Sequence, residues 1–482
     1  MKKLLVLLCL LLILGLFAVC AIGATVSTGR DLVTFTPRPL YGDPAAADGA
    51  TLTVRAHLDS HLLWDVTYPL GGEAQADYRA SLRELSFDRR PDIAGIQLYE
   101  DIEFGLNTRT PIGELTGLEI AYRELFDRTE AGTKGKAEVR LQDYYTYYPI
   151  HVDVNLPGTL WHGRDYEDLL DDDFVNERAV WDAFREFFRI PIPEDLPAFE
   201  ISVVKNADGS IGGCGSSAPK EGAHYSFYAE SAYTADACYL TINNRYGEGY
   251  VDTSLIPGGY GVYRFTYGNV RNAQNTQGNA TIFHPGYVTG VHAETLAMVY
   301  PLDESIHVNG MFVTPDEERL LLVCRDRTEK TSLTVIDLAT MQEIQTVPVT
   351  DGEWVSLHQE KDFLVLFYGQ RLSVYRLCED GSYAHVLTAD QPSAVNEAFA
   401  RINTHAAVDL DGDRVIFVDL LDEVRYSALQ TANVCVAVYD ASGLRYYGEY
   451  DNSLAVNPHT SDYGYNVIPV TFGVELIGDV GN

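Results

Sequence analysis

The densest group of side chains that could bind a ligand is a run of aromatic residues at 144–148, with the sequence YYTYY. Outside a cell, aromatic rings can stack on sugar faces or on peptide ligands. Tyrosine also has a high β propensity, and half of a strand's side chains point into a core, so a structural role is the alternative. A second tyrosine pair near the C-terminus could lie on the same surface as this run. We therefore predict a ligand-binding surface that contains Tyr144, Tyr145, Tyr147, Tyr148, Tyr463 and Tyr465.

The chain lacks the short motifs that mark common catalytic and metal sites. It has no G-x-S-x-G, no H-E-x-x-H and no C-x-x-C. The segment 213–217, GCGSS, is predicted to be a flexible loop, and it has no identifiable base that could activate its cysteine or serines. The segment 409–413, DLDGD, alternates carboxylates, but Val418 stands where a calcium loop needs glutamate, so a hairpin turn is predicted. We assign no catalytic residue, no metal site and no cofactor.

Residues 4–24 form an unbroken apolar run that follows Lys2 and Lys3. As a helix this run would be about 30 Å long, which matches the hydrocarbon layer of a bilayer. The two lysines favour a cytoplasmic N-terminus. The rest of the chain is therefore predicted to lie outside the cytoplasm. It would be held in the cell membrane by a single pass, or secreted if the leader is cut near residues 21–23, where small residues stand.

The part that follows this leader is strongly acidic. The chain has 35 basic and 69 acidic residues, and the leader holds two of the lysines, so the remainder carries a net charge of −36. This charge argues against nucleic acid as a partner, and against electrostatic binding to anionic lipid. Five cysteines outside the leader are widely spaced. The sequence permits one disulfide, between Cys214 and Cys238, but does not require it.

The C-terminal third repeats a unit of four short strands joined by tight turns. The clearest copies cover residues 308–349, 353–388 and 403–450, and their turns are rich in Asp, Gly, Pro and Ser. Upstream, HYSFYAES, ACYLTINN, YGVYRFTY and TLAMVYPL make a looser copy. Four antiparallel strands every 40–60 residues or so are typical of a β-propeller blade.

The segment 314–349 resembles a blade of the WD40-like or YVTN-like superfamily. The resemblance rests on the turn after its first strand, the V-I-D end of its third strand, and the Thr-containing turn that follows. The resemblance implies a propeller fold. It implies no particular activity, because the sequence lacks the W-D ending of WD40 proteins, the paired glycines of Kelch repeats and the sequence box of sialidase-type propellers.

The predicted fold is all-β: a β-propeller of about seven four-stranded blades, with one inserted amphipathic helix and an N-terminal membrane-spanning helix. Residues 1–24 would be the signal peptide or anchor, 25–48 a linker and 49–482 the propeller. The helical insertion covers about 160–193, where Phe174, Trp181, Phe184 and Phe188 share one helix face.

The final strand-like run, 466–476, has no blade after it. Since an open ring would leave an unpaired sheet edge, we expect this run to complete a blade whose other strands lie within residues 30–100.

Together these features predict an exported, membrane-tethered propeller that acts as a binding or scaffolding module. Its partner would be a protein, peptide or glycan outside the cell. The alternative is an extracytoplasmic propeller hydrolase or lyase that acts on polysaccharide. Propeller active sites are assembled from several blades, so motif spacing does not exclude an enzyme. Paired carboxylates about 5–10 Å apart would favour it.

Overall fold

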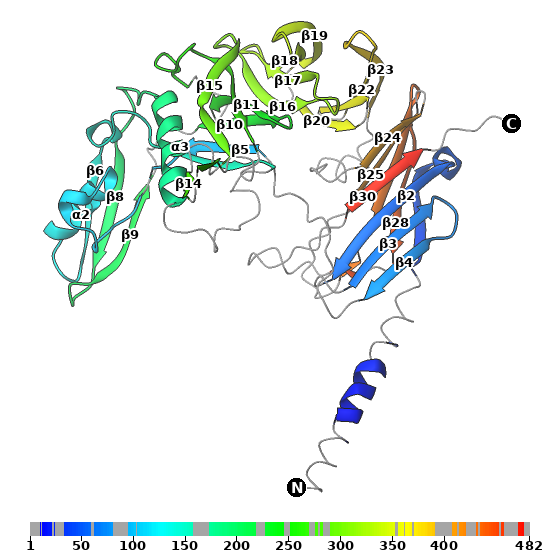
Figure 1. The fold of residues 1–482 in the computed structure, drawn as a ribbon, viewed down its shortest axis with the longest axis horizontal. Helices are drawn as coiled ribbons and strands as arrows, with labels where there is room; N and C mark the ends of the chain where they lie inside the picture. The colour runs from blue at the N-terminus through cyan, green and yellow to red at the C-terminus, as the bar shows by residue number, and fades with distance from the viewer. Residues whose placement is uncertain are drawn as a thin grey trace. The chain divides into compact units, whose positions relative to one another are not determined.

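A computed structural model shows that the protein is built mostly of antiparallel β-sheets (Figure 1). The chain divides into two compact units, which are described separately. Unit 1 comprises Met1–Arg90 and Val355–Asn482, and unit 2 comprises Pro91–Trp354. The structure describes residues 10, 12–21, 24, 33–58, 62–80, 95–102, 104–157, 173–217, 227–244, 251–268, 275–277, 280–282, 290–351, 355–360, 362–368, 371–390, 407–411, 414–420, 430–431, 434–452, 455–456 and 471–476.

The largest sheet of unit 2 has six strands in the order β15-β12-β11-β10-β5-β7. Its strands are β5 (Gly95–Glu100), β7 (Ile150–Asn155), β10 (Phe227–Tyr233), β11 (Ala237–Asn244), β12 (Gly261–Tyr267) and β15 (Val291–Pro301). The four strands predicted as a looser repeat are therefore neighbours in one sheet, which β5 and β7 extend. A small hairpin, β13 (Asn275–Gln277) and β14 (Ala280–Ile282), lies between β12 and β15 in the chain.

The second sheet of unit 2 follows the chain as a meander. Its strands, in order, are β16 (His307–Val313), β17 (Arg319–Arg325), β18 (Lys330–Asp337) and β19 (Gln342–Asp351). Leu320 and Leu322 of β17 pack with Tyr239 and Val262 of the six-stranded sheet. The alternate residues Leu321 and Val323 are equally buried. An apolar run without alternation therefore makes a strand that is covered on both faces.

One face of the six-stranded sheet is covered by helix α3 (Asp173–Phe187). Phe184 and Phe188 are fully buried in this core, and Trp181 is partly buried against it, as the predicted helix face requires. Apolar side chains on alternate positions of β7, at Ile150, Val152 and Val154, supply the sheet's half of the core. An amphipathic helix predicted within about 160–193 is thus present at Asp173–Phe187, while residues 160–172 lie outside the described residues.

Unit 2 also contains a helix that the sequence analysis missed. Helix α2 (Leu118–Arg128) packs on a three-stranded sheet with the order β6-β8-β9. The strands are β6 (Thr133–Val139), β8 (Phe199–Lys205) and β9 (Ile211–Ser217). The prediction of a flexible loop at 213–217 is therefore wrong. The segment is an edge strand, because its extended backbone pairs with β8 along its whole length.

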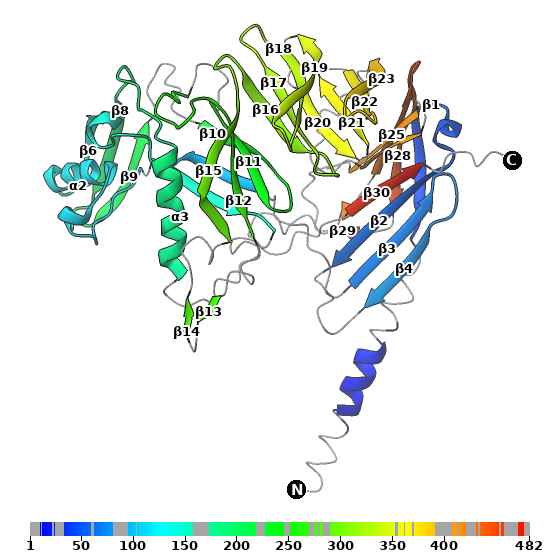
Figure 2. The same ribbon diagram turned by 45° about the horizontal axis from the view of Figure 1, so that its top comes forward.

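Among its described residues, unit 1 has three sheets of four or five strands (Figure 2). One is a meander of β20 (Val355–Glu360), β21 (Phe363–Tyr368), β22 (Arg371–Leu377) and β23 (Tyr383–Asp390). The next has the order β1-β28-β27-β25-β24, with β1 (Phe35–Gly42), β24 (Ala407–Asp411), β25 (Arg414–Leu420), β27 (Val434–Asp440) and β28 (Gly443–Asn452). Strands β26 (Gln430–Thr431) and β29 (Ala455–Val456) pair separately.

The third sheet of unit 1 joins the two ends of the chain. Strands β2 (Ala50–Leu58), β3 (Leu62–Pro69) and β4 (Gln75–Ala80) form a meander, and β30 (Thr471–Leu476) pairs with β2 from Ala50↔Leu476 to Arg55↔Thr471. The C-terminal run therefore completes a sheet from the predicted N-terminal range. Closure of a whole ring, the boundaries of the propeller domain and the count of seven blades stay predictions.

The five-stranded sheet is buried on both faces by its neighbours. Ile416 and Val436 pack toward Leu52 and Val66 of the sheet that contains β30. The alternate residues, such as Phe417, pack against the β20–β23 sheet. Sheets in each unit thus stack face to face, with apolar side chains between them.

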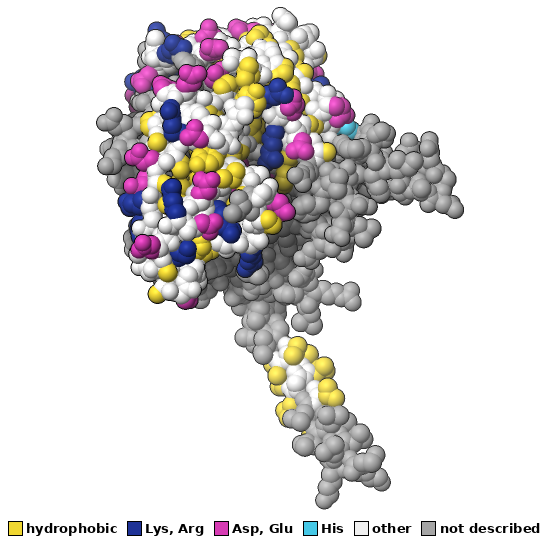
Figure 3. Space-filling model, turned by 90° about the vertical axis from the view of Figure 1, so that its left-hand side faces the viewer, with side chains coloured by type: hydrophobic (Ala, Val, Ile, Leu, Met, Phe, Trp, Pro, Cys, Tyr) yellow, Lys and Arg dark blue, Asp and Glu magenta, His cyan; other side chains and the backbone are white. Residues whose placement is uncertain are grey.

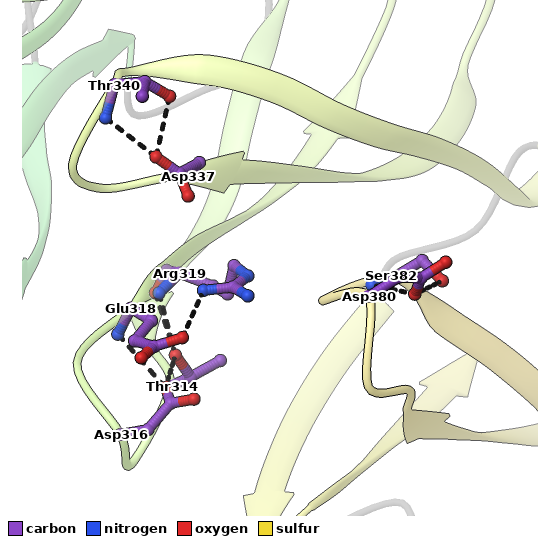
Figure 4. A network of polar contacts seen from close by, with 8 residues as sticks. All are labelled: Thr314, Asp316, Glu318, Arg319, Asp337, Thr340, Asp380 and Ser382. Atoms are coloured by element: carbon purple, nitrogen blue, oxygen red, sulfur yellow. Dashed lines mark hydrogen bonds and ion pairs between the residues drawn. The ribbon is translucent and has the colours of Figure 1, made fainter.

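Hydroxyl–aspartate turns join many of these strands (Figure 4). Between β18 and β19, the Asp337 carboxylate accepts hydrogen bonds from the N–H and the hydroxyl of Thr340, at 2.8 and 2.7 Å. Asp380 receives the same pair of bonds from Ser382. These contacts lower the pKa of both aspartates. Such turns explain why Asp, Ser and Thr recur between the predicted strands.

Residues 12–21 of the leader are helical, and their apolar side chains, such as Leu16 and Phe17, are exposed. Within the described residues, no helix is both long enough and apolar enough to cross a bilayer.

Candidate functional site

Two of the predicted ligand-binding tyrosines pack against the core of unit 2. The Tyr148 ring is buried and meets Phe227 edge-on, at 5.8 Å between ring centroids. The Tyr145 hydroxyl accepts the N–H of Leu118 at the start of α2, at 3.1 Å. Both tyrosines belong to the packing around the core of unit 2.

The other predicted tyrosines are only partly placed. Tyr144 and Tyr147 are half-buried, and the Arg189 guanidinium lies over the Tyr147 ring at 5.9 Å. Tyr463 and Tyr465 lie outside the described residues. A recognition surface shared by all six tyrosines therefore stays a prediction.

A second group of polar and aromatic side chains lies on the six-stranded sheet, on the face that points away from its apolar core. Strand pairing places His151 beside Tyr99, Tyr99 beside Tyr228, and Tyr228 beside Asn243. We call this the aromatic row. It crosses four strands, β7, β5, β10 and β11. Because side chains alternate along a strand, it lies back to back with the apolar core at Ile150 and Phe227.

An acidic row runs parallel to the aromatic row, two residues further along each strand. It contains Asp153 beside Gln97, and Glu230 beside Thr241. Burial raises the pKa of Glu230 from its ordinary 4.5 to about 7. No described residue forms an ion pair or hydrogen bond with its carboxylate, so nothing offsets the cost of removing that charge from water.

The strands β5 and β10 meet at only one bridge, Tyr99↔Tyr228, and side chains replace the other ladder bonds. The Ser231 hydroxyl accepts the N–H of Ile96 at 3.1 Å. The Glu100 carboxylate accepts the N–H of Phe227 at 2.9 Å. This seam lies beside Glu230, so the two rows cross from β5 to β10 without a regular backbone ladder.

One end of the aromatic row is covered by the β16–β19 sheet. The Asn243 amide donates to the C=O of Val308 at 2.8 Å and accepts the N–H of Val308 at 3.1 Å. His307 lies 3.4 Å from the Tyr228 hydroxyl. Burial, and then the charge of Arg325, lower the pKa of His307. A neutral imidazole is therefore favoured at this covered end.

The other end of the two rows is more open. Tyr99 and His151 are half-buried, and their rings stack at 4.8 Å between centroids with an interplanar angle of 27°. Asp153 is half-buried, and Gln97 is exposed. Trp181 of α3 lies beyond His151, at 6.3 Å between ring centroids. This open end combines flat aromatic surface with carboxylate and amide groups.

The sequence analysis missed these rows because their members come from four strands between residues 97 and 243. The alternation of Ile150, Val152 and Val154 with His151 and Asp153 is readable in the sequence and is typical of a half-buried strand. It did not show which neighbouring strands would add Tyr99 and Glu230 to the same face.

The described residues contain no group of three or more His, Cys, Asp or Glu side chains that could hold a metal ion. Asp409–Asp411 of the DLDGD segment end β24, which pairs antiparallel with β25 as the predicted hairpin requires, with Asp411 opposite Arg414; residues 412–413 lie outside the described residues. Cys214 and Cys238 are both free, so the bond left open between them is not formed.

Comparisons with known proteins give weak structural likenesses only. No family model and no curated protein sequence matches the chain. Among solved structures, a putative 6-phosphogluconolactonase from Bacteroides fragilis has 9% identity and a TM-score of 0.28, covering 90% of this chain and 100% of that one. The periplasmic gluconolactonase of Pseudomonas aeruginosa has 10% identity and a TM-score of 0.30, covering 89% and 99%. Apo AztD from Citrobacter koseri has 10% identity and a TM-score of 0.27, covering 88% and 98%. At these TM-scores the likenesses decide neither fold nor function.

Proposed function

We propose that the protein is an exported, membrane-tethered β-propeller that acts as a binding module outside the cytoplasm. The observation that carries the binding role is the open end of the two rows, where the Tyr99–His151 stack lies beside Asp153 and Gln97. The apolar leader supports the address, and the stacked meander sheets support the propeller fold.

The chemistry of the open end favours a ligand with a flat apolar face and several hydroxyl groups. Aromatic rings supply the flat surface, while a carboxylate and an amide supply hydrogen-bond acceptors and a donor. A sugar ring combines these features, so an extracellular glycan is the partner we favour. A peptide with an aromatic or proline side chain is the competing partner.

The test is a binding screen of the full-length protein in detergent against a panel of oligosaccharides and a panel of peptides. Any hit is then titrated by calorimetry against Tyr99→Ala and against Tyr300→Phe as a matched control. Tyr300 lies on β15 and only its hydroxyl is removed, so this variant should bind like wild type. Loss of at least tenfold in affinity on Tyr99→Ala alone supports the site. Unchanged binding by both variants places the ligand elsewhere.

The alternative function is that of a hydrolase or lyase that cleaves polysaccharide. One structural observation favours this alternative. Asp153 and Glu230 share the acidic row and are separated by strand β5. Both carboxylates lie on the same face of the sheet, and a pair of carboxylates is what a glycosidase requires. Glu230, with its pKa near 7, would act as the general acid, and Asp153 would act as the base that activates water.

Binding and hydrolysis are separated by following reducing ends released from any oligosaccharide that binds. Under the binding account, no sugar is cut, and Glu230→Gln binds as well as wild type. Release of reducing ends by wild type, abolished in both Glu230→Gln and Asp153→Asn, would replace the binding role with the enzymatic one.

A further inference from the structure

The open end of the two rows contains a carboxylate that no described cation balances. Asp153 is half-buried on β7, and no described residue forms an ion pair or a hydrogen bond with its side chain. The four strands that carry the rows, β7, β5, β10 and β11, contain no lysine and no arginine. Charges of one sign at a surface that is partly shielded from water attract ligands of the opposite sign.

The arginines of neighbouring elements are held by other groups. On α3, the Arg185 guanidinium donates to the C=O of Ile150 at 2.9 Å. At the covered end of the rows, the Arg325 guanidinium lies 3.3 Å from the Glu329 carboxylate. Arg264 is on β12, which three strands separate from β7. None of these three guanidinium groups forms an ion pair with the carboxylate at the open end.

Elsewhere in unit 2, carboxylates have cations close to them. Figure 3 shows Lys and Arg side chains interspersed with Asp and Glu on the side that carries α2 and the three-stranded sheet. There the Lys136 ammonium lies 2.6 Å from the Glu200 carboxylate, and the Arg123 guanidinium lies 3.3 Å from the Asp127 carboxylate. Within the described part of unit 2, the unbalanced charge of Asp153 is therefore a local feature of the six-stranded sheet.

The acidic row leads from solvent into the protein. Gln97 is exposed, Asp153 and Glu230 are half-buried, and Thr241 is fully buried. Among the described residues, neither the Thr241 hydroxyl nor the Glu230 carboxyl has a hydrogen-bond partner. Tyr260, whose hydroxyl lies near Thr241, donates instead to a backbone C=O at 2.8 Å. The inner half of the row therefore has hydrogen-bonding groups that are free to meet a polar ligand.

We propose that the glycan bound at the open end is a polymer of amino sugars with free, protonated amines. The amine binds Asp153, the sugar ring stacks on Tyr99, and a ring hydroxyl faces Glu230, which stays neutral. This inference rests on the binding role proposed above, and it adds the charge of the ligand to that role.

Strand geometry allows one sugar to make these contacts together. Tyr99 and Asp153 are diagonal neighbours on one face, since Tyr99 pairs with His151 and Asp153 pairs with Gln97. Diagonal neighbours have Cα atoms about 7–8 Å apart, so a ring on the tyrosine can place an amine at the carboxylate. An ammonium group is also attracted to the face of a tyrosine ring.

The charge of the site also disfavours two other classes of glycan. Polysaccharides with carboxylate or sulfate groups would bring like charges to Asp153, in a chain whose net charge is already −34. An N-acetylated sugar has the same ring but offers no positive charge to this carboxylate. The free amine is therefore the group that distinguishes the proposed ligand.

The experiment compares two probes that differ only in this group. Full-length protein in detergent is titrated by calorimetry at pH 6 with a tetramer of glucosamine and with a tetramer of N-acetylglucosamine. The glucosamine tetramer should bind at least tenfold more tightly. Equal binding of the two tetramers, or tighter binding of the acetylated one, would overturn the inference.

Two variants assign the preference to a residue. Asp153→Asn removes the charge and keeps the shape, so it should narrow the difference between the two tetramers to less than threefold. Glu138→Gln removes an exposed carboxylate on another sheet and should keep the full difference. A full preference in Asp153→Asn would overturn the assignment. The comparison of tetramers on the wild type decides the charge of the ligand even if this variant does not fold.

Failure of this inference is distinguishable from failure of the binding role. If neither tetramer binds but a neutral or acidic oligosaccharide does, the amine is excluded and the glycan-binding role stands. If no oligosaccharide of any charge binds, both proposals fail.

Discussion

Replacement of Glu230 by glutamine should change how the stability of unit 2 depends on pH. The pKa of Glu230 is 4.5 in an exposed setting and about 7 in the folded protein, because the carboxyl is buried. The folded protein therefore holds the proton more tightly than the unfolded chain. Its stability is greatest below pH 4.5, falls as the pH rises, and levels off above pH 7.

The size of this effect follows from the two pKa values. The two pKa values differ by about 2.5. At 1.36 kcal/mol for each pKa unit, this difference corresponds to about 3 kcal/mol of stability. Glutamine has nearly the same shape and stays neutral. Glu230→Gln should therefore stabilise unit 2 by up to about 3 kcal/mol at pH 8, and have almost no effect at pH 4.

The assay is urea unfolding at pH 4, 6 and 8. Hydrogen-exchange mass spectrometry on peptides from β10 and β11 serves as the readout of unfolding. These peptides report on the sheet that contains Glu230 rather than on the whole chain. Glu138→Gln, an exposed position on β6, is the control and should show no pH-dependent gain. An equal gain at pH 4 and pH 8, or no gain at pH 8, would refute the burial argument.

Four further outcomes are expected from the fold. Asn243→Ala should destabilise unit 2 by about 2–4 kcal/mol in urea unfolding, because both its amide bonds to β16 are buried. Asp337→Ala should reduce the loss of stability as the pH falls below 3.8, because Thr340 lowers the pKa of Asp337 in the fold only; an unchanged acid melting profile would contradict this. Glu329→Gly should raise the melting temperature slightly, since Glu329 has a φ of 65° that glycine adopts without strain. Deletion of residues 464–482 should expose the edge of β2 and cause aggregation in light scattering; a monomer that melts like the intact protein would show that β30 is dispensable.

The sequence predicted the strands well where the physical signal was local. Runs such as Leu320–Val323, bounded by turn residues, located strands that pair in chain order. The C-terminal strand was placed by a different argument, the need to cover an open edge, and it does pair with the N-terminal β2.

The missed elements show where local signals end. In α2, Leu118, Tyr122 and Phe126 have readable helical spacing, but the helix is short and Gly117 gives its start no side-chain cap. The glycines and serines of β9 suggested a loop, because pairing with β8, rather than β propensity, holds that strand extended. A dense tyrosine run suggested a surface, yet Tyr148 is buried in the core.

The central claim, that the folded units work outside the cytoplasm, is tested most directly by protease accessibility. Intact cells that express the full-length chain are treated with a protease that does not enter them, and fragments are detected with an antibody against residues 307–351. The account predicts digestion of the chain without lysis, while a cytoplasmic marker stays intact. Full protection of the chain until the cells are lysed would contradict it.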